Sequence, residues 1–435
     1  MDIAIDKRQQ EPKKVDEWIE YIEQVANKAL PSNYNFEIAK CVAKVQQLGA
    51  KTVALQMPEG LLAWGCEIAD ILKFFCDTLN EVVIMADVTY GACCIDDLTA
   101  QALGCDLIIH YGHSCLVPVT DVLIPCLYVF VEISFSSDHL AKVVTQLFDP
   151  DDDIFLMGTI QYSNVLREAA GKIDATGHFR RMVVVPQVSP LLPGEVLGCT
   201  SPILKHCRFE VNERSDCCMS ASSCTPEDKA PDNAKQKIIF VADGRFHLES
   251  ALIHNPGIPA YRFDPFKKTV TEESYDVVAL HAARREAIER AKEAKSVCLV
   301  LSMLGRQGNI NIMKSIVKML QSKNIAYHVR LLSEITIDKL EQLDVDAYIQ
   351  IGCPRLSIDW GAGFGKPILN PYESFVAFNN EEYKSVYPMD YYSKAGGNWS
   401  NYTANSKVAP VVDSKEAILR RLQQRAKAKQ LMYSS

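Results

Sequence analysis

Strand-like and helix-like patterns alternate along nearly the whole chain, and this alternation most limits the folds that it can adopt. Short apolar runs such as TVALQM at 52–57, VVIMADV at 82–88 and DLIIHYG at 106–112 are separated by helical spacing at 61–75 and 96–103. Strands that alternate with helices are typical of parallel sheets covered by helices. The sequence therefore predicts an α/β fold with parallel, Rossmann-like sheets.

The same series of patterns occurs three times. The second series contains IFLMGTIQY, a helix from Asn164 to about Lys172, RMVVVPQ and KIIFVADGRFH; the third contains SVCLVLSML, a helix from Ile310 to Ser322, AYHVRLL, DAYIQIGCP and KPILNPYE. We expect each series to present three strand-end loops in the same order, with a cysteine in the second. We interpret this as one domain in triplicate, closed around a pseudo-threefold axis.

Three of the 15 cysteines stand apart because each follows a strand pattern, comes after a small residue and opens a turn. They are Cys93, Cys199 and Cys353. The C-terminal ends of parallel strands are where open α/β sheets bind ligands, and a small preceding residue lets the backbone approach a bulky group. A threefold arrangement would bring these thiols to a common centre. Four thiolates are typical of structural zinc, whereas three leave one position open, as on a 4Fe-4S cluster with one free iron.

The other cysteines favour different roles. Five lie in amphipathic or strand-like stretches and are expected to fill the core: Cys41, Cys66, Cys76, Cys126 and Cys298. No pair has the spacing Cys-x-x-Cys of zinc ribbons and thioredoxin-type redox sites. His206, Cys207, Cys217, Cys218 and Cys224 lie in or beside a polar stretch at about 208–236, which we interpret as an insertion, with a zinc site as the alternative.

Several strings in order closely resemble one family. They are LPSNYNFEI, ALQMPEGLL, ADVTYGACCIDDLTAQALGCDLIIHYGHSCLVP, GTIQY, LGCTSP, DGRFHLES, LGRQGN, IGCPRLSIDWG and YPMDYY, from about Leu30 to Tyr392. They resemble the diphthamide-biosynthesis 2-(3-amino-3-carboxypropyl)histidine synthases of the eukaryotic subunit 1 type. The paralogous subunit 2 type is similar but lacks the middle cysteine that Cys199 supplies here.

The resemblance implies a non-standard radical enzyme with a 4Fe-4S cluster held by Cys93, Cys199 and Cys353. S-adenosylmethionine would bind the open iron and lose its 3-amino-3-carboxypropyl group as a radical, which would add to a histidine of translation elongation factor 2. The implied partners are the paralogous subunit 2 in a heterodimer, a small CSL-type iron protein as electron donor, and the elongation factor as substrate. No catalytic residue beyond the cluster ligands is implied.

Candidate residues for binding S-adenosylmethionine lie in loops expected at strand ends beside the cluster. They are Pro58, Glu59, Gly60, Tyr90, His113, Thr159, Gln161, Arg306, Gln307 and Gly308. Arg306 suits a carboxylate, because a guanidinium fork matches that group, but an arginine that ties domains together is an equal alternative. For His113 and His247 a structural role is favoured over acid–base chemistry, and His110 is expected in the core.

We expect an N-terminal extension at 1–35, three α/β domains at 36–136, 137–264 and 265–392, and a C-terminal tail at 393–435. The formal net charge of −8 argues against a nucleic-acid-binding surface. The chain shows no signal-peptide pattern and no apolar run long enough to cross a membrane, so we expect a cytoplasmic location. Two alternatives stay open, a quinolinate-synthase-like 4Fe-4S enzyme and a non-catalytic scaffold subunit.

Overall fold

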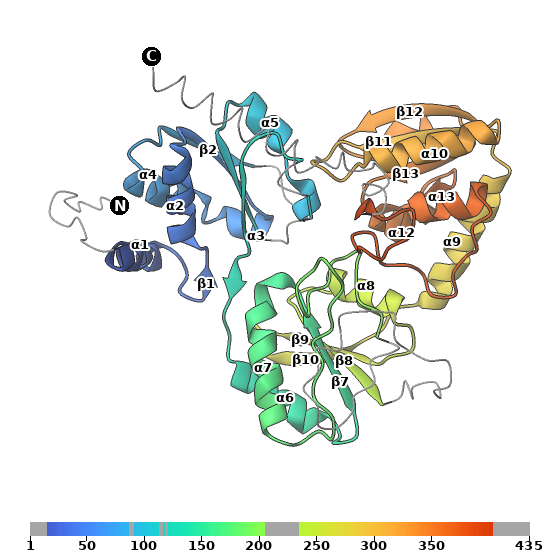
Figure 1. Ribbon diagram of the computed structural model, residues 1–435. Helices are drawn as coiled ribbons and strands as arrows, with labels where there is room; N and C mark the ends of the chain where they lie inside the picture. The colour runs from blue at the N-terminus through green and yellow to red at the C-terminus, as the bar shows by residue number, and fades with distance from the viewer. Residues whose placement is uncertain (1–14, 87–90, 113–115, 118–120, 205–234, 403–435) are drawn as a thin grey trace, which may run out of the picture.

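The computed structural model describes residues 15–86, 91–112, 116–117, 121–204 and 235–402. Three four-stranded sheets follow one another along the chain, and Figure 1 shows each sheet with its helices in a lobe of its own. We call them the first unit (β2 to β5), the second unit (β7 to β10) and the third unit (β11 to β14). The α/β fold with parallel sheets is confirmed. None of the helices described is long and apolar enough to span a membrane.

The first unit has the strand order β3-β2-β4-β5, and all of its strands are parallel. The strands are β2 (Thr52–Gln56), β3 (Glu81–Met85), β4 (Leu107–Tyr111) and β5 (Cys126–Val129), and the helices are α1 (Val15–Ala29), α2 (Ile38–Leu48), α3 (Glu59–Leu62), α4 (Gly65–Phe75), η2 (Ala92–Cys94) and α5 (Asp97–Ala102). β4 is buried along its whole length, as expected for a central parallel strand. The stretch 61–75, predicted as one helix, is divided between α3 and α4.

Helix α1 packs onto this unit although it falls within the expected N-terminal extension. Trp18 and Tyr21 meet the ring of Phe75 edge-on, with ring centroids 5.4 and 5.6 Å away, and Ile22 is buried. The strands β1 (Tyr34–Asn35) and β6 (Glu132–Ile133) pair in a small antiparallel sheet, which joins two segments that are far apart in the sequence. Apolar burial therefore makes the described part of the extension integral to the first unit.

The second unit has the order β10-β9-β8-β7, with β10 antiparallel to β9. It contains α6 (Ser137–Leu147), β7 (Asp153–Gly158), η3 (Ile160–Tyr162), α7 (Ser163–Ala175), β8 (Gln236–Val241), α8 (Phe246–His254), β9 (Ala260–Asp264) and β10 (Thr269–Glu273). The strand predicted at RMVVVPQ is wrong: only Val184 forms an isolated bridge, to Phe155. Pro186 ends that segment, because proline has no N–H to donate to a neighbouring strand. The next hydrogen bond to β7 is made by Gly194, whose carbonyl accepts from the Gly158 N–H.

The third unit has the order β12-β11-β13-β14, again all parallel. It contains α9 (Val277–Lys292), β11 (Ser296–Ser302), α10 (Ile310–Ser322), β12 (Ala326–Leu332), α11 (Ile337–Glu341), β13 (Ala347–Ile351), α12 (Arg355–Trp360), η4 (Gly361–Gly363), β14 (Ile368–Leu369) and α13 (Pro371–Phe378). The predicted helix from Ile310 to Ser322 is confirmed. It begins at Asn309, whose side chain accepts hydrogen bonds from the backbone N–H groups of Asn311 and Ile312.

The matching strand orders of the first and third units correct one predicted feature. Cys93 follows β3, the second strand of its unit, but Cys353 follows β13, which occupies the position of β4. The prediction that the second loop of every unit holds the cysteine is therefore wrong for the third unit. Parallel strands β12 and β13 end at the same edge of the sheet, so either loop brings a thiol to that edge.

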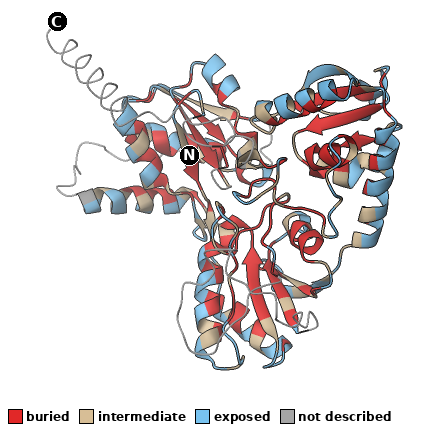
Figure 2. Cartoon of the chain, turned by 45° about the vertical axis from the view of Figure 1, so that its right-hand side comes forward, coloured by how far each residue is buried: buried red, intermediate tan, exposed pale blue. Residues whose placement is uncertain are grey.

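Buried residues fill each sheet and continue into the segment after α13. Figure 2 shows the strands mostly buried and the outer faces of the helices exposed. In the segment 387–402, which we call the C-terminal strap, Tyr387, Trp399 and Ser400 are almost wholly buried. Trp399, in the range expected to form a C-terminal tail, thus packs into the largest hydrophobic cluster of the described chain.

Candidate functional site

Three turns from three different sheets carry Cys93, Cys199 and Cys353. Cys93 lies in η2 after β3, and Cys353 lies between β13 and α12. Cys199 lies in a tight turn closed by reciprocal backbone hydrogen bonds between Leu197 and Thr200. Each of the three cysteines is partly buried and carries a free thiol.

The three thiols lie near one another, since the nearness of Cys199 and Cys353 raises the pKa of Cys93 and that of Cys353 raises the pKa of Cys199. The pKa of Cys93 is raised by its hydrogen bond with Cys94, by burial, and by the proximity of Cys199 and Cys353. Burial and the proximity of Cys353 raise the pKa of Cys199 to about 12, and burial raises that of Cys353 to about 11. Thiolates that repel one another in a buried place favour a cation between them, since metal binding removes the protons and offsets the repulsion.

The chemistry of the three side chains is that of iron-sulfur ligands, since soft thiolate sulfurs bind the irons of such clusters. Within the described ranges, no three His, Cys, Asp or Glu side chains form a group that could hold a single metal ion. In a cubane cluster each cysteine binds a different iron, so the ligands stand apart around a group of several atoms. The three thiols, with soft sulfur donors from three separate loops, therefore fit an iron-sulfur cluster.

Contacts from the third unit hold the Cys93 turn in place. The backbone N–H of Arg306 donates to the Cys93 carbonyl at 2.8 Å, and Nε2 of Gln307 donates to Sγ of Cys94 at 3.0 Å. Gly305 has a φ of 52°, and a Cβ there would lie 2.4 Å from the Cys94 carbonyl carbon. Only glycine allows this approach, so the LGRQGN loop and the Cys93 turn are fitted to each other.

Arg355 ties the Cys353 turn to the second unit, and sequence analysis did not single it out. Its guanidinium donates to the carbonyls of Gly198 and Phe246, at 3.4 and 2.8 Å, and to the carboxylate of Glu249 at 2.5 Å. Both oxygens of Asp359 accept from its Nε at 2.9 Å. The one available signal was an arginine two residues after a candidate ligand, which is too common to identify a partner.

The glycines before Cys199 and Cys353 lie against protein side chains in the direction that a Cβ would take. A Cβ at Gly198 would lie 2.2 Å from the ring of Phe246, and a Cβ at Gly352 would lie 2.7 Å from Cβ of Ser302. Protein side chains therefore occupy the space that the missing Cβ atoms leave. These glycines serve the packing of the turns that carry the cysteines.

Arg306 forms a bidentate ion pair with Asp97 of α5. Nε and Nη2 donate to the two carboxylate oxygens at 2.8 and 2.5 Å, and the Leu123 N–H also donates to Asp97 at 2.6 Å. Burial alone would raise the pKa of Asp97, but these hydrogen bonds outweigh it and leave the pKa below its usual value. Of the two roles open for Arg306, the structure shows the tie between units.

The remaining candidate loops fall into two groups. In the first unit, Pro58 precedes α3 and packs on Gly112, while Glu59 and Gly60 are exposed. In the second, Thr159 is buried with a hydroxyl that has no partner among the described atoms, and Gln161 lies in η3.

Gly308 of the LGRQGN loop makes a tight turn, since a Cβ there would lie 2.2 Å from the Ser302 carbonyl oxygen. Tyr90 and His113 lie outside the described residues. Among the hydrogen bonds described, those of Arg306 and Gln307 reach the Cys93 turn and none joins Thr159 or Gln161 to a cysteine.

Two of the three histidines considered lie among the described residues. His110 is buried and its Nδ1 lies 3.1 Å from Oε1 of Gln56, which confirms its place in the core. His247 lies in the first turn of α8, edge-on to Phe246.

The expected core cysteines are largely confirmed. Cys41, Cys76 and Cys298 are buried and Cys126 is half-buried, but Cys66 is exposed, because it lies on the outer side of α4. His206, Cys207, Cys217, Cys218 and Cys224 lie outside the described residues.

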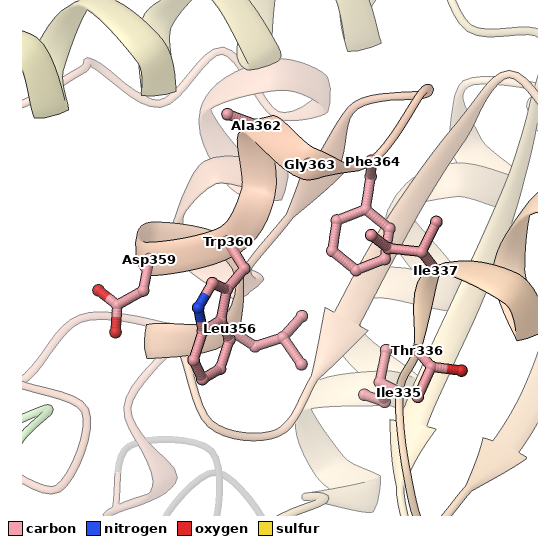
Figure 3. Close-up of a pocket in the computed structure, with 9 residues that line it drawn as sticks. All are labelled: Ile335, Thr336, Ile337, Leu356, Asp359, Trp360, Ala362, Gly363 and Phe364. Atoms are coloured by element: carbon pink, nitrogen blue, oxygen red, sulfur yellow. The ribbon is translucent and has the colours of Figure 1, made fainter.

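An apolar groove of about 460 Å³ opens on the third unit beside the Cys353 turn (Figure 3). Ile335, Thr336 and Ile337 follow β12, whereas the other lining residues, from Leu356 to Phe364, belong to α12 and the turn after it. In Figure 3 the side chains of Leu356 and Trp360 lie side by side and Ile337 faces Phe364. Asp359 points away from them, as its ion pair with Arg355 requires.

Comparisons with known proteins agree on one family. Residues 57–388 match the family model described as "Putative diphthamide synthesis protein". The chain is 46% identical to 2-(3-amino-3-carboxypropyl)histidine synthase subunit 1 of Homo sapiens over 385 residues, which are 88% of this chain and 80% of that protein. It is 46% identical to the protein of the same name from Mus musculus over 384 residues, 87% of this chain and 80% of that one. It is also 45% identical to the Aspergillus fumigatus protein over 379 residues, 86% and 78% of the two chains.

Solved structures of Dph2 from Pyrococcus horikoshii share the fold. One has a TM-score of 0.61 at 24% identity and covers 81% of this chain and 94% of that one. The other, solved with a 4Fe-4S cluster, has a TM-score of 0.62 at 23% identity and covers 82% and 94%. The cluster belongs to that archaeal protein.

Proposed function

The chain belongs to the diphthamide synthesis family, and on that premise we propose that it transfers a 3-amino-3-carboxypropyl group from S-adenosylmethionine to a histidine of elongation factor 2. Its relatives bear the name histidine synthase subunit 1, so its place is in diphthamide biosynthesis. The observation that carries the proposal is the gathering of Cys93, Cys199 and Cys353 from three sheets.

We propose that these three thiolates hold a 4Fe-4S cluster and leave one iron free for S-adenosylmethionine. The cluster, when bound, would supply the electron that breaks the bond between the sulfonium sulfur and the γ-carbon. The protein must orient the substrate, because reduction can break any of three bonds to that sulfur. The candidates for that task are Pro58, Glu59, Gly60, Tyr90, His113, Thr159, Gln161, Arg306, Gln307 and Gly308.

Hydrogen bonds among the described residues support this site by joining the three cysteine turns. Arg355 donates to the Cys199 turn, and the LGRQGN loop donates to the Cys93 turn, so the third unit joins both others. The proposed organisation is therefore three α/β domains, at 36–136, 137–264 and 265–392, around a pseudo-threefold axis with the cluster at its centre. Rigid connections between the three turns keep the ligand positions fixed while the cluster binds.

The proposed partners follow from the same premise. The name subunit 1 implies a second subunit, for which we propose the paralogous subunit 2 in a cytoplasmic heterodimer. A CSL-type iron protein is the proposed electron donor. Elongation factor 2 is the proposed substrate.

The first prediction is that the three cysteines are each required for the cluster. Anaerobically prepared protein should be brown, with about four iron and four sulfide per chain. Cys93→Ala, Cys199→Ala and Cys353→Ala should each lose most of that iron, because two thiolates hold a cubane poorly, whereas Cys94→Ala should keep it. Iron and sulfide assays on the four variants measure this, and unchanged iron in all three ligand variants would exclude the proposed site.

Product analysis tests the reaction itself. Dithionite-reduced heterodimer with S-adenosylmethionine should release methylthioadenosine and add the group to elongation factor 2. Deoxyadenosine would indicate ordinary radical chemistry, and quinolinate formation would favour the quinolinate-synthase alternative. A colourless protein without products would favour a scaffold.

A further inference from the structure

Tyr392 of the C-terminal strap reaches the place where the cysteines meet. It belongs to the largest hydrophobic cluster of the described chain, against which Cys93 and Cys199 also pack, and it is 7% exposed. Burial raises the pKa of its hydroxyl well above the usual value, and the nearness of Cys93, Cys199, Cys353 and Cys94 raises it further. Tyr392 is therefore buried in the hydrophobic cluster against which two of the three cysteines pack.

The backbone around Tyr392 is fixed to the middle cysteine turn. Its N–H donates to Oγ1 of Thr200 at 2.9 Å, the Tyr391 N–H donates to the Cys199 carbonyl at 3.3 Å, and the Ser201 N–H donates to the Met389 carbonyl at 2.9 Å. Three hydrogen bonds at Met389, Tyr391 and Tyr392 leave little freedom for this part of the strap. The position of the phenol is thus set by the turn that carries a candidate ligand.

The neighbouring tyrosine has different surroundings. The strongest charged neighbours of Tyr391 are Glu373 and Asp390, and those of Tyr392 are cysteines. Glu373 itself belongs to a buried network with Arg284 and Tyr387 in the third unit. Tyr391 therefore belongs to the core of one unit, whereas Tyr392 faces the site shared by three.

We infer that the hydroxyl of Tyr392 donates a hydrogen bond to sulfur at the cluster site and thereby makes the cluster easier to reduce. This rests on the proposed function, since it requires that a cluster be held there. An ordinary tyrosine phenol carries its proton at neutral pH, and the hydroxyl of Tyr392 makes no hydrogen bond within the described part of the protein, so it is available as a donor. A donor to cluster or cysteine sulfur stabilises the more negative, reduced state.

The test compares Tyr392→Phe with the matched variant Tyr391→Phe, each in the anaerobically prepared heterodimer. Iron content and unfolding temperature are measured first, and then the reduced fraction in a dithionite titration followed by electron paramagnetic resonance. Tyr392→Phe should bind as much iron as the unmodified protein. Its ratio of reduced to oxidised cluster at a fixed potential should fall about tenfold, which is about 59 mV for a one-electron couple. Tyr391→Phe should leave the ratio unchanged.

The other outcomes show whether the inference alone fails or the proposed function fails with it. A fully loaded Tyr392→Phe with an unchanged ratio would overturn the inference and leave the proposed function intact. Loss of iron in Tyr392→Phe at an unchanged unfolding temperature would also overturn it, by making the phenol a part of cluster binding. Equal falls in both tyrosine variants would show a general effect of the strap. Absence of a cluster from the unmodified heterodimer would overturn the proposed function together with the inference.

Discussion

The Arg306–Asp97 pair joins the third unit to the first through a carboxylate that is almost wholly buried. The side chain of Asp97 is 1% exposed and that of Arg306 is 28% exposed. Removing the arginine takes two hydrogen-bond donors from a buried charge. Because burial opposes the charged form of Asp97, its low pKa in the folded protein depends on Arg306 and on the Leu123 amide.

We therefore predict that Arg306→Ala lowers the free energy of unfolding by about 2 kcal/mol, at the low end for a stranded buried charge because Arg306 is partly exposed. Since the folded-state pKa of Asp97 is lowered, this stabilisation is present above the unfolded value and is lost as pH falls through the folded value. Denaturant titrations of both proteins should differ at pH 7 and converge below about pH 4. Lys292→Ala, which removes an exposed pair with Glu289, is the control and should cost little. Equal stability of Arg306→Ala and the unmodified protein at pH 7 would contradict this.

At the level of residues, the sequence predicts which side chains could bind a metal better than it predicts which side chains contact one another. The three cysteines follow from their residue type and their place after strands. The partner of Arg306 could not be found in this way, because Asp97 lies 209 residues away and nothing local marks it. Tyr392 was missed for the same reason, since only the return of the strap to the Cys199 turn brings it to the site.

Among the elements, the turn at Gly198 shows how packing fixes a ligand position. The ring of Phe246 lies against Gly198, and the guanidinium of Arg355 lies 4.3 Å above the centre of the same ring. A displaced ring therefore displaces the arginine that joins the Cys199 and Cys353 turns.

We predict that Gly198→Ala lowers the free energy of unfolding by about 1 to 3 kcal/mol, the usual cost of overpacking, and lowers the iron content of the prepared protein. Gly171→Ala in α7 is the matched control: a Cβ there meets nothing within 4 Å, and alanine in a helix is favoured over glycine by about 0.5 to 1 kcal/mol. Thermal unfolding and iron assays measure both. The double change Gly198→Ala with Phe246→Leu should recover part of the loss, and a harmless Gly198→Ala would show that the ring moves freely.

Strands and helices with strong periodicity were predicted well, and irregular segments were not. The apolar runs that form β2, β4, β8, β11 and β13 were identified because buried parallel strands are nearly continuous in hydrophobic residues. RMVVVPQ has the same composition, but the proline and the glycine turn that follow break its ladder. Which strand of the third unit precedes Cys353 depends on the pairing of β13 with β11 and β14. The sequence of one segment does not reveal that pairing.

At the scale of the whole molecule, the sequence pattern predicted three similar units, but it did not predict the contacts that join them. Three parallel-stranded sheets were predicted, and the described chain has three four-stranded sheets besides the small β1–β6 sheet. The connections between them come from isolated side chains and from the strap, which has no repeated counterpart and no strong periodicity. A division into domains by pattern alone places residues after 392 in a tail, because nothing in their composition shows that they return to the core.

The strap gives the last prediction, which concerns the integrity of the molecule. Trp399 is 1% exposed, donates to Oδ1 of Asp390 at 2.6 Å and packs against Tyr372 with ring centroids 4.8 Å apart. Farther along, the Asn401 N–H donates to the Tyr391 carbonyl at 2.9 Å, and the Asn401 side chain accepts a hydrogen bond from Asn309.

A chain that ends at residue 392 should therefore lose at least about 3 kcal/mol of unfolding free energy, the usual cost of removing a buried tryptophan. It should also lose iron, because residues 389–392, which bond to the Cys199 turn, would lose the support of Trp399 on Asp390 and of Asn401 on Tyr391. A chain that ends at residue 402 keeps all of these contacts and should match the full-length protein in denaturant titration and iron content. Trp399→Ala should reproduce most of the loss in stability without shortening the chain. Equal stability and iron in the two truncated chains would mean that the strap lies on the core without supporting it, and that the three units hold the cysteine turns by themselves.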